Sequence, residues 1–450
     1  MKSSVRDMTS GSPAKLILRF SLPVMVSNAF HQLYILADSI IVSRMLGVKA
    51  LAALGSADWY TFMFVSIVQA LVQGFAIQAG QEFGAHRQHH LHQTLARSIV
   101  LTCAAAVLLT LFATGTLRNI LFLLQTPEDV YDLAHAYLLT IFLGLGATTF
   151  LNFTSAMLRA LGNAKVPLWS MIISTILNIF LDLVMVRSMG ITGAALATVI
   201  SQAAGGFINL YAMMHIPLLH MEKADWKRNE ALDGKLLKLS LPMMMQNLLI
   251  SGGGMIVQSV VNPLGVTFIA GYTATNKLYG VLEVAAVSYG YAMSTYSGQN
   301  LGAKKMSRIR RGTRAGALAG VVTAAIIALC MFLFGRQIVS LFIDAGEANA
   351  AGAIDIAVEY LWLMSAFLPV LYVLHVYRST LQGMGDTVMP MVSGLAEFVM
   401  RTGAALLLPG LIGYPGVFWA EVLAWVGADL ILVPSYWMGF KRAQKLCGVE

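Results

Sequence analysis

The chain is dominated by long apolar runs that are separated by short polar segments. The runs are continuous and lack the strict alternation of a half-buried β-strand. A helix needs roughly 20 mostly apolar residues to cross the hydrocarbon core of a bilayer. We therefore predict about twelve spanning helices, near residues 20–46, 51–82, 98–123, 130–157, 166–187, 191–215, 239–262, 267–298, 315–334, 353–381, 388–410 and 417–438.

The composition strengthens this prediction. Of 450 residues, 57% are hydrophobic and 12% are charged, whereas soluble domains carry about 25% charged residues. The predicted helices leave room for short loops and exclude a large soluble domain. The three cysteines have neither the spacing of a disulfide framework nor that of a metal site. The predicted fold class is an all-α membrane protein.

Lysine and arginine are strongly biased toward one side of the predicted membrane. Of the 30 such residues, 23 fall on the side of the termini and four on the other side. Cytoplasmic loops carry such an excess, so we place both termini in the cytoplasm and the protein in the plasma (inner) membrane. The net charge of +8 then reflects topology and attraction to anionic membrane lipids. We expect no nucleic-acid partner.

The two halves of the chain share short motifs at nearly constant offsets. Five pairs of motifs show the repeat: Ser21-Leu22-Pro23 with Ser240-Leu241-Pro242, Leu46-Gly47-Val48 with Leu264-Gly265-Val266, Gly84-Ala85 with Gly302-Ala303, Gly162 with Gly385, and Gly190 with Gly413. We predict an N-lobe over residues 1–215, a cytoplasmic linker over 216–238 and a C-lobe over 239–450. Six spans per half make the halves parallel repeats, which are typical of secondary transporters.

No nucleotide-binding motif of the form G-x-x-x-x-G-K-[ST] occurs in the chain. Transport would therefore draw on an ion gradient or be passive. A histidine-rich loop, with His86, His89, His90 and His92, is interpreted as a solvated basic loop, and no resident metal or other cofactor is expected.

Polar side chains of the N-half gather at one predicted depth. Asp38, Asp182 and Thr198 lie roughly 12, 8 and 10 Å from the outer ends of their helices, and Asn178 shares a face with Asp182. This group can bind Na⁺ through oxygens or hold a proton on a carboxyl. The alternative is that both carboxylates cap loops or face water at the outer surface.

The C-half has lost these acids. The positions equivalent to Asp38 and Asp182 are Ile256 and Ala405, and those equivalent to the amide and the hydroxyl are Arg401 and Glu421. We predict that Arg401 pairs with Glu421. Glu397, four residues before Arg401, lies on the same helix face and is included in this structural ion pair.

Two further charges lie in the predicted eighth span. Lys277 and Glu283 are six residues apart, which places them about 120° from alignment on one helix. Each either lines a central substrate cavity, where Glu283 attracts a cation, or pairs with another helix. Tyr34 of the first span is a third candidate for the substrate cavity.

These features resemble the multidrug and toxic compound extrusion (MATE) family over essentially the whole chain. The resembling stretches are His31 to Tyr34, Asp38 to Val42, Gly47 with Ala50 to Ala53, Gln81 to Ala85, Gly298 to Ala303 and Leu381 to Asp386. The resemblance implies two six-helix bundles around a V-shaped cavity. It also implies alternating access and export of organic cations or drugs against Na⁺ or H⁺.

Within that family the chain is most similar to the DinF-like branch. This resemblance implies a cation site in the N-lobe, formed by Asp38, Asn178, Asp182 and Thr198, with Asn152 as the candidate for a fifth member. The seventh-helix glutamate of the other branch is absent, and Gln258 is the nearest polar residue.

We therefore predict a secondary active efflux transporter, and not an enzyme. It would act as a monomer that exchanges H⁺ or Na⁺ for organic cations, drugs or other small amphipathic molecules. One alternative is a flippase for lipid-linked precursors, which shares the architecture. Another is an intramembrane enzyme that uses Asp38 and Asp182 as paired acids. The sequence leaves the substrate and the choice between Na⁺ and H⁺ open.

Overall fold

The computed structural model describes residues 5–123, 126, 128–343 and 349–446, and these are almost entirely α-helical. The helices are α1 (Pro13–Leu46), α2 (Val48–Gly84), α3 (Gln88–Leu123), α4 (Glu128–Leu143), α5 (Leu145–Ala160), α6 (Lys165–Met189), α7 (Ile191–Met214), α8 (Glu230–Val261), α9 (Val266–Gly302), α10 (Met306–Val339), α11 (Ala350–Gly383), α12 (Val388–Leu407), α13 (Pro409–Ile412) and α14 (Pro415–Leu446). Three short 3₁₀ helices are η1 (Pro217–Leu219), η2 (Lys223–Trp226) and η3 (Asn262–Leu264).

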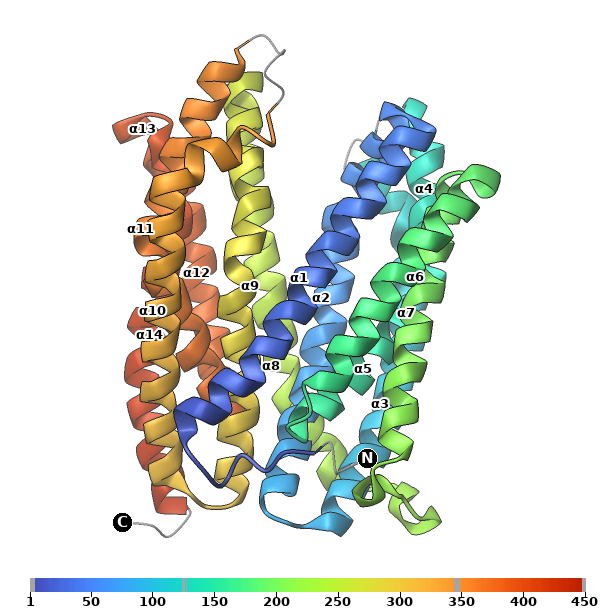
Figure 1. Ribbon diagram of the computed structural model, residues 1–450, viewed down its shortest axis with the longest axis vertical. Helices are drawn as coiled ribbons and strands as arrows, with labels where there is room; N and C mark the ends of the chain where they lie inside the picture. Colours follow the sequence, from blue (N-terminus) through green and yellow to red (C-terminus); the bar gives the residue numbers. More distant parts are fainter. Residues whose placement is uncertain (1–4, 124–125, 127, 344–348, 447–450) are drawn as a thin grey trace. The chain divides into compact units, whose positions relative to one another are not determined.

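The helices form two compact units. The N-terminal unit contains the described residues up to Asp7 and residues Pro23–Met244, and the C-terminal unit contains Met8–Leu22 and residues from Met245 onward. Helices α2 to α7 run alongside one another in the first unit, and α9 to α14 in the second (Figure 1). The boundary between Asp7 and Met8 precedes α1, and the other two lie inside helices, next to Pro23 of α1 and close to Pro242 of α8.

The helices have the length and polarity expected of membrane spans. By length and composition, nine helices among the described residues could each cross a membrane, and the bent pair α4–α5 would be a tenth if it forms one span. Helices α1 and α9 have 34 and 37 residues and are long enough to cross a membrane, although they are not among these nine. Together these make up the twelve predicted spans.

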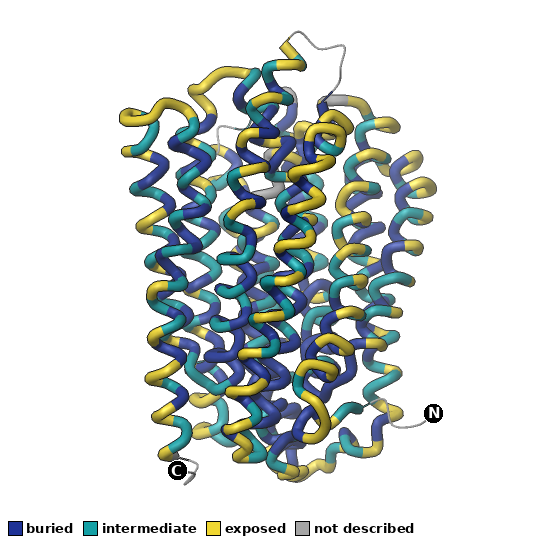
Figure 2. The backbone as a smooth tube through the Cα atoms, turned by 60° about the vertical axis from the view of Figure 1, so that its left-hand side comes forward, coloured by how far each residue is buried: buried dark blue, intermediate teal, exposed yellow. Residues whose placement is uncertain are grey.

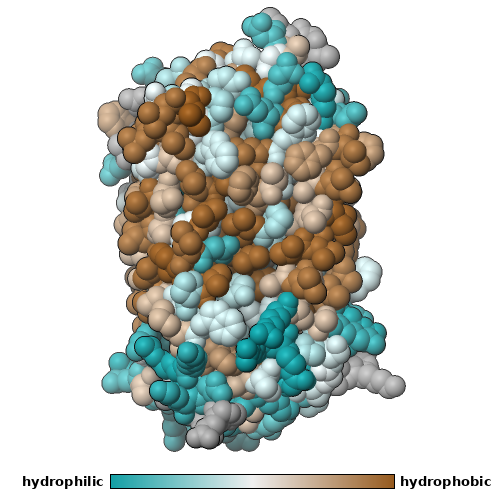
Figure 3. Space-filling view, turned by 90° about the vertical axis from the view of Figure 1, so that its left-hand side faces the viewer, coloured by the Kyte–Doolittle hydropathy of each residue, from teal (hydrophilic) through white to brown (hydrophobic). Residues whose placement is uncertain are grey.

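Each helix buries one side and exposes another. Buried and exposed positions alternate along the helices (Figure 2). On one face of the molecule, hydrophobic side chains cover the middle and hydrophilic ones gather toward both ends (Figure 3). Large exposed side chains such as Leu318, Ile326 and Leu333 of α10 are suited to contact with lipid tails.

The fourth predicted span, residues 130–157, is bent in a way that its hydropathy does not indicate. It consists of α4 and α5, which meet at Gly144 with an angle of 47°. A Cβ atom at Gly144 would lie 2.1 Å from Cγ2 of Val199 in α7. The bend thus coincides with a close approach of α7. The predicted linker 216–238 also differs from the structure, because α8 already begins at Glu230.

The sequence repeat extends to the backbone conformation of the turns. Paired glycines adopt left-handed φ angles of 86° and 93° (Gly47 and Gly265), 77° and 85° (Gly162 and Gly385), and 60° and 75° (Gly190 and Gly413). His86 and Lys304, 218 positions apart, have φ of 54° and 57°. Glycine populates this region without steric cost, which explains its place in both halves.

We expect Gly162→Ala to lower the free energy of unfolding by about 1–3 kcal/mol. The backbone of Gly162 is left-handed, and a Cβ atom there would lie 2.1 Å from the carbonyl oxygen of Arg6. Thermal unfolding in detergent measures the effect. Gly115→Ala is the matched control, because no atom lies within 4 Å of its Cβ position and alanine favours a helix. Equal unfolding midpoints for the two variants would contradict the prediction.

Segment 216–229, which contains η1 and η2, is held against α3 by contacts between polar side chains. The buried carboxylate of Asp225 lies 3.1 Å from Nδ1 of His89 and 3.5 Å from Nδ1 of His92. At the start of α8, Asp233 accepts hydrogen bonds from Arg97 at 2.8 and 2.7 Å. Among the residues that the structure describes, no group of three His, Cys, Asp or Glu side chains could hold a metal ion.

Candidate ion-coupling site

The N-terminal unit brings four of the predicted polar residues together in its interior. Asp38 projects from α1, Asn178 and Asp182 from α6, and Thr198 from α7. All four are buried, and Asn178 and Asp182 have no exposed surface. Asn178 and Asp182 share one face of α6 because they are four residues apart. The alternative in which both carboxylates face water at the surface does not fit this burial.

The two carboxyl groups face each other. The carboxyl of Asp182 lies within the range of a side-chain hydrogen bond to Asp38 and in its electrostatic field. Two negative charges this close repel, so a shared proton or a bound cation stabilises the pair.

Several polar atoms at this site lack partners. Both carboxylate oxygens of Asp182, and Oδ1 and Nδ2 of Asn178, have no hydrogen-bond partner among the described residues. Two ionised carboxylates are both acceptors, so a proton on either of them would supply the missing donor. Buried polar atoms are rarely left unsatisfied. The site is therefore chemically suited to a proton, a small cation or water.

Tyr34 belongs to this site. Its hydroxyl lies close to Thr198 and Gln202 and in the electrostatic field of both carboxyls. It forms no hydrogen bond of regular geometry within the described part of the chain. The sequence placed Tyr34 in the substrate cavity, whereas the structure buries it beside the carboxyl pair.

Gln202 and Thr148 connect the site to α5, and sequence reasoning did not single them out. Thr148 Oγ1 donates to Gln202 Oε1 at 2.5 Å, and Asn152 Nδ2 donates to the carbonyl oxygen of Thr148 at 2.8 Å. Among the described residues, Asn152 is thus linked to Gln202 through Thr148. The spacing of Thr198 and Gln202, four residues apart on α7, was the signal that could have identified Gln202.

We expect Asn178→Leu to leave thermal stability unchanged or raised while it lowers transport by roughly tenfold or more. Asn178 buries two polar atoms without partners, and each such atom costs about 1–3 kcal/mol. Leucine has the same branched shape and the same number of side-chain heavy atoms, and it removes that cost, but it offers no oxygen or N–H to an ion or its water. Unfolding midpoints and efflux rates, measured on the same preparation, test this. A marked loss of stability would mean that Asn178 is structural.

In the C-terminal unit, Arg401 of α12 and Glu421 of α14 form a largely buried ion pair. Arg401 Nη2 donates to Glu421 Oε2 at 2.8 Å, and Nη1 donates to the carbonyl oxygen of Ile250 at 3.2 Å. The structure thus brings together the two charges that replace the amide and the hydroxyl of the N-half.

Glu397 does not pair with Arg401, which corrects the sequence-based expectation for this residue. Its carboxylate instead accepts a hydrogen bond from Arg378 of α11, which also donates to Ser393 Oγ at 3.3 Å. The guanidinium of Arg378 is buried. Helix packing brings this second arginine to Glu397, and helical spacing alone gave no sign of it.

Lys277 and Glu283 of α9 differ in their surroundings, and Glu283 lies in the electrostatic field of Glu421. Lys277 is exposed. Oε1 of Glu283 lies 3.4 Å from Nε2 of His375 in α11. Glu283 therefore has a partner on a neighbouring helix, which corresponds to the second of the two roles considered for it.

The chain matches known proteins over nearly its full length. A family model described as MatE matches residues 23–184 and 242–406. The probable multidrug resistance protein YpnP of Bacillus subtilis is 28% identical over 98% of each chain. DNA damage-inducible protein F of Escherichia coli is 27% identical over 73% of each chain.

The fold also matches solved structures. A crystal structure of a MATE protein in complex with MaL6 superposes with a TM-score of 0.91 at 20% identity, over 99% of this chain and 100% of that chain. An outward-facing MATE transporter of the MOP superfamily gives 0.91 at 20% identity, over 99% of each chain. The predicted all-α fold of two six-helix bundles is confirmed.

Proposed function

The chain belongs to the MatE family of multidrug efflux transporters, and on this premise we propose that it is an antiporter that exports small organic molecules against an inward flow of H⁺ or Na⁺. One observation carries the proposal. The N-terminal unit buries two facing carboxyl groups, Asp38 and Asp182, beside an asparagine whose polar atoms have no partner among the described residues. Such a site is costly unless it binds an ion.

The residues of the site define what each ion would require. A proton would sit between the carboxyl groups of Asp38 and Asp182 and complete a hydrogen bond between them. Na⁺ would use their oxygens together with Oδ1 of Asn178 and Oγ1 of Thr198, since hard cations prefer oxygen ligands. The hydroxyl of Tyr34, which lies close to Thr198 and Gln202, would help to position Thr198.

Coupling follows if the ion and the substrate each favour one conformation. A ligand shifts an equilibrium only by its difference in affinity between the two states. Moving a population from 1:99 to 99:1 takes about 5.5 kcal/mol of such a difference. Charge neutralisation at a buried carboxyl pair can supply energies of this order. We propose that ion binding changes the packing of α1 against α6 and α7 in this way.

The substrates are proposed to be organic cations, drugs or other amphipathic molecules. Support comes from relatives such as YpnP, which is named a probable multidrug resistance protein. These relatives do not favour the flippase alternative. We further propose that the protein acts as a monomer in the plasma (inner) membrane, with both termini in the cytoplasm, on the basis of its asymmetric basic residues.

A proteoliposome flux assay tests the proposal. A pH gradient and a Na⁺ gradient are imposed separately across vesicles that contain the purified protein, and movement of a fluorescent organic cation is followed. We expect uphill transport with one gradient, and its collapse when that gradient is dissipated. A transport rate that depends on neither gradient would contradict the proposed ion coupling. A covalently altered substrate would indicate an enzyme.

A further inference from the structure

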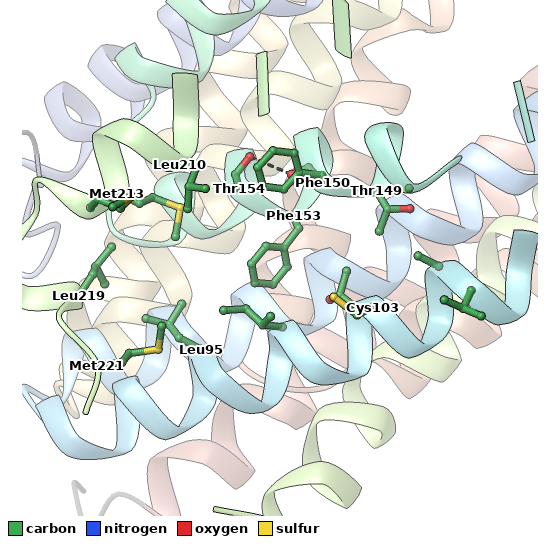
Figure 4. Close-up of a pocket in the computed structure, with 16 residues that line it drawn as sticks. Leu95, Cys103, Thr149, Phe150, Phe153, Thr154, Leu210, Met213, Leu219 and Met221 are labelled. Carbon is green, nitrogen blue, oxygen red and sulfur yellow. Dashed lines mark hydrogen bonds between the residues drawn. The ribbon is translucent and has the colours of Figure 1, made fainter. Parts of the chain in front are cut away.

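The N-terminal unit contains a cavity that shares no residue with the ion-coupling site. Its volume is about 570 Å³, which is within the range of ligand-binding pockets. It lies between α3, α5 and α7 and is closed at one end by the segment after α7 (Figure 4). Phe153 projects into it from α5, and Leu210 and Met213 of α7 form one side.

The cavity is apolar and open on one side. Its floor includes the buried side chains of Leu95, Phe153 and Leu219, whereas Val107 of α3 and Met214 of α7 are exposed at its edge. Both α3 and α7 are long and apolar enough to span a membrane. The opening therefore faces lipid tails. An apolar void of this size would forfeit dispersion contacts and suits water poorly, so hydrocarbon is its natural content.

The hydrogen-bonding capacity of the lining is small. Thr149 and Thr154 donate to the carbonyl oxygens of Leu145 and Phe150 in their own helix at 2.8 and 2.9 Å. Of the lining hydroxyls, only that of Thr102 has no hydrogen-bond partner among the described residues. No lining residue carries a charge. The cavity is thus unsuited to an organic cation and suited to a hydrocarbon chain.

The dimensions match one leaflet of a bilayer. Along α3 the lining runs from Leu95 to Val107, which is roughly 18 Å at the rise of an α-helix. Half of the hydrocarbon core is about 15 Å thick. A single acyl chain that enters from the end near Leu95 would therefore fit along its length.

The end of the cavity near Met221 carries the features of a headgroup site. Met221 lines the cavity, and the exposed cations Lys223, Lys227 and Arg228 follow it within seven residues. Trp226 between them is also exposed, as is common for tryptophan at the membrane interface. Nη2 of Arg228 also lies 3.2 Å from Oε1 of Glu230, with which it forms an ion pair. Basic clusters of this kind attract anionic lipid headgroups.

We propose that this cavity binds one acyl chain of an anionic phospholipid, from the leaflet that faces segment 216–229. The phosphate lies against Lys223, Lys227 and Arg228, and the chain lies between α3, α5 and α7. The bound lipid fills the space between α3 and this segment and holds the two together. The inference does not depend on the coupling ion or on the exported substrate.

Photo-crosslinking in liposomes tests this. The probe is phosphatidylglycerol with a diazirine midway along one acyl chain, and labelled peptides are identified by mass spectrometry. We expect peptides from α3 and α7 that line the cavity to be labelled roughly tenfold more than those of lipid-exposed α10. Equal labelling of α10 would overturn the proposal. So would equal labelling at the cavity by phosphatidylcholine with the same diazirine, because it would remove the role of the anionic headgroup.

Two sets of variants separate the cavity from the headgroup site. Gly146 lines the cavity and has no atom within 4 Å of its Cβ position, so Gly146→Leu should fill the space and abolish the enrichment. Gly115→Leu is the matched control, because it also has free space but lies outside the cavity, and it should keep the enrichment. Replacing Lys223, Lys227 and Arg228 by Gln should reduce phosphatidylglycerol labelling to the phosphatidylcholine level. Unchanged labelling in Gly146→Leu would contradict the assigned position.

Discussion

Vesicles that contain the Asp182→Asn protein will not move substrate against a gradient, although the protein will still fold and exchange substrate for substrate. Asparagine keeps the shape of a protonated carboxyl but can neither release a proton nor offer a charged oxygen to Na⁺. The variant therefore cannot alternate between the ion-bound and the ion-free form of the site. Substrate exchange needs no net ion movement and therefore survives.

The same result is expected for Asp38→Asn, because the carboxyl groups of Asp38 and Asp182 face each other and act as one unit. The double variant should be no worse than either single variant. The matched control is Asp355→Asn, whose exposed carboxylate pairs with Arg336 at 2.9 Å on the surface. Uphill transport at the wild-type rate by both single variants would refute the site assignment.

The second large effect concerns stability. Arg401→Met is expected to lower the free energy of unfolding by about 3–5 kcal/mol, because it leaves the largely buried Glu421 without its partner. The double variant Arg401→Met/Glu421→Leu removes both charges and should recover most of the loss. Thermal or denaturant unfolding of the wild type, both single variants and the double variant gives the coupling energy directly.

This cycle also separates a structural from a transport role. If the pair only supports packing, the double variant will be stable and will transport at close to the wild-type rate. A double variant that is stable but inactive would place Arg401 and Glu421 in the transport cycle. Ser39→Ala serves as the control variant for preparation and assay, since the half-buried Ser39 donates to the carbonyl oxygen of Ile35 in its own helix.

Helical spacing in the sequence identified most, but not all, residues of the ion-coupling site. Asn178 and Asp182 could be assigned to one face of a helix because a helix repeats every 3.6 residues. Depth in the membrane could be estimated for Asp38 and Thr198 by counting from the helix ends. Gln202 was missed, although it lies four residues after Thr198, because its importance depends on Thr148 and Tyr34 from two other helices.

In the C-terminal unit, the sequence predicted one ion pair correctly and did not predict the other. Comparison of the halves placed Arg401 opposite Glu421 because equivalent positions in a repeat are neighbours in both copies. The partner of Glu397 could not be found in this way. Arg378 contacts Glu397 from α11, and the position of the N-half that is equivalent to Arg378 carries no charge. His375 beside Glu283 is a similar case.

The sequence by itself determined the all-α membrane fold, the number of spans, and the repeat with its shared glycines. Each of these depends on local hydrophobicity or on backbone constraints that a short segment carries alone. Tertiary structure alone decided the bend at Gly144, the pairing of Glu397 with Arg378, the place of Tyr34 beside the carboxyls and the cavity between α3, α5 and α7. These depend on which helix faces meet, and in a bilayer that choice follows from packing and polar contacts between helices and not from hydrophobicity.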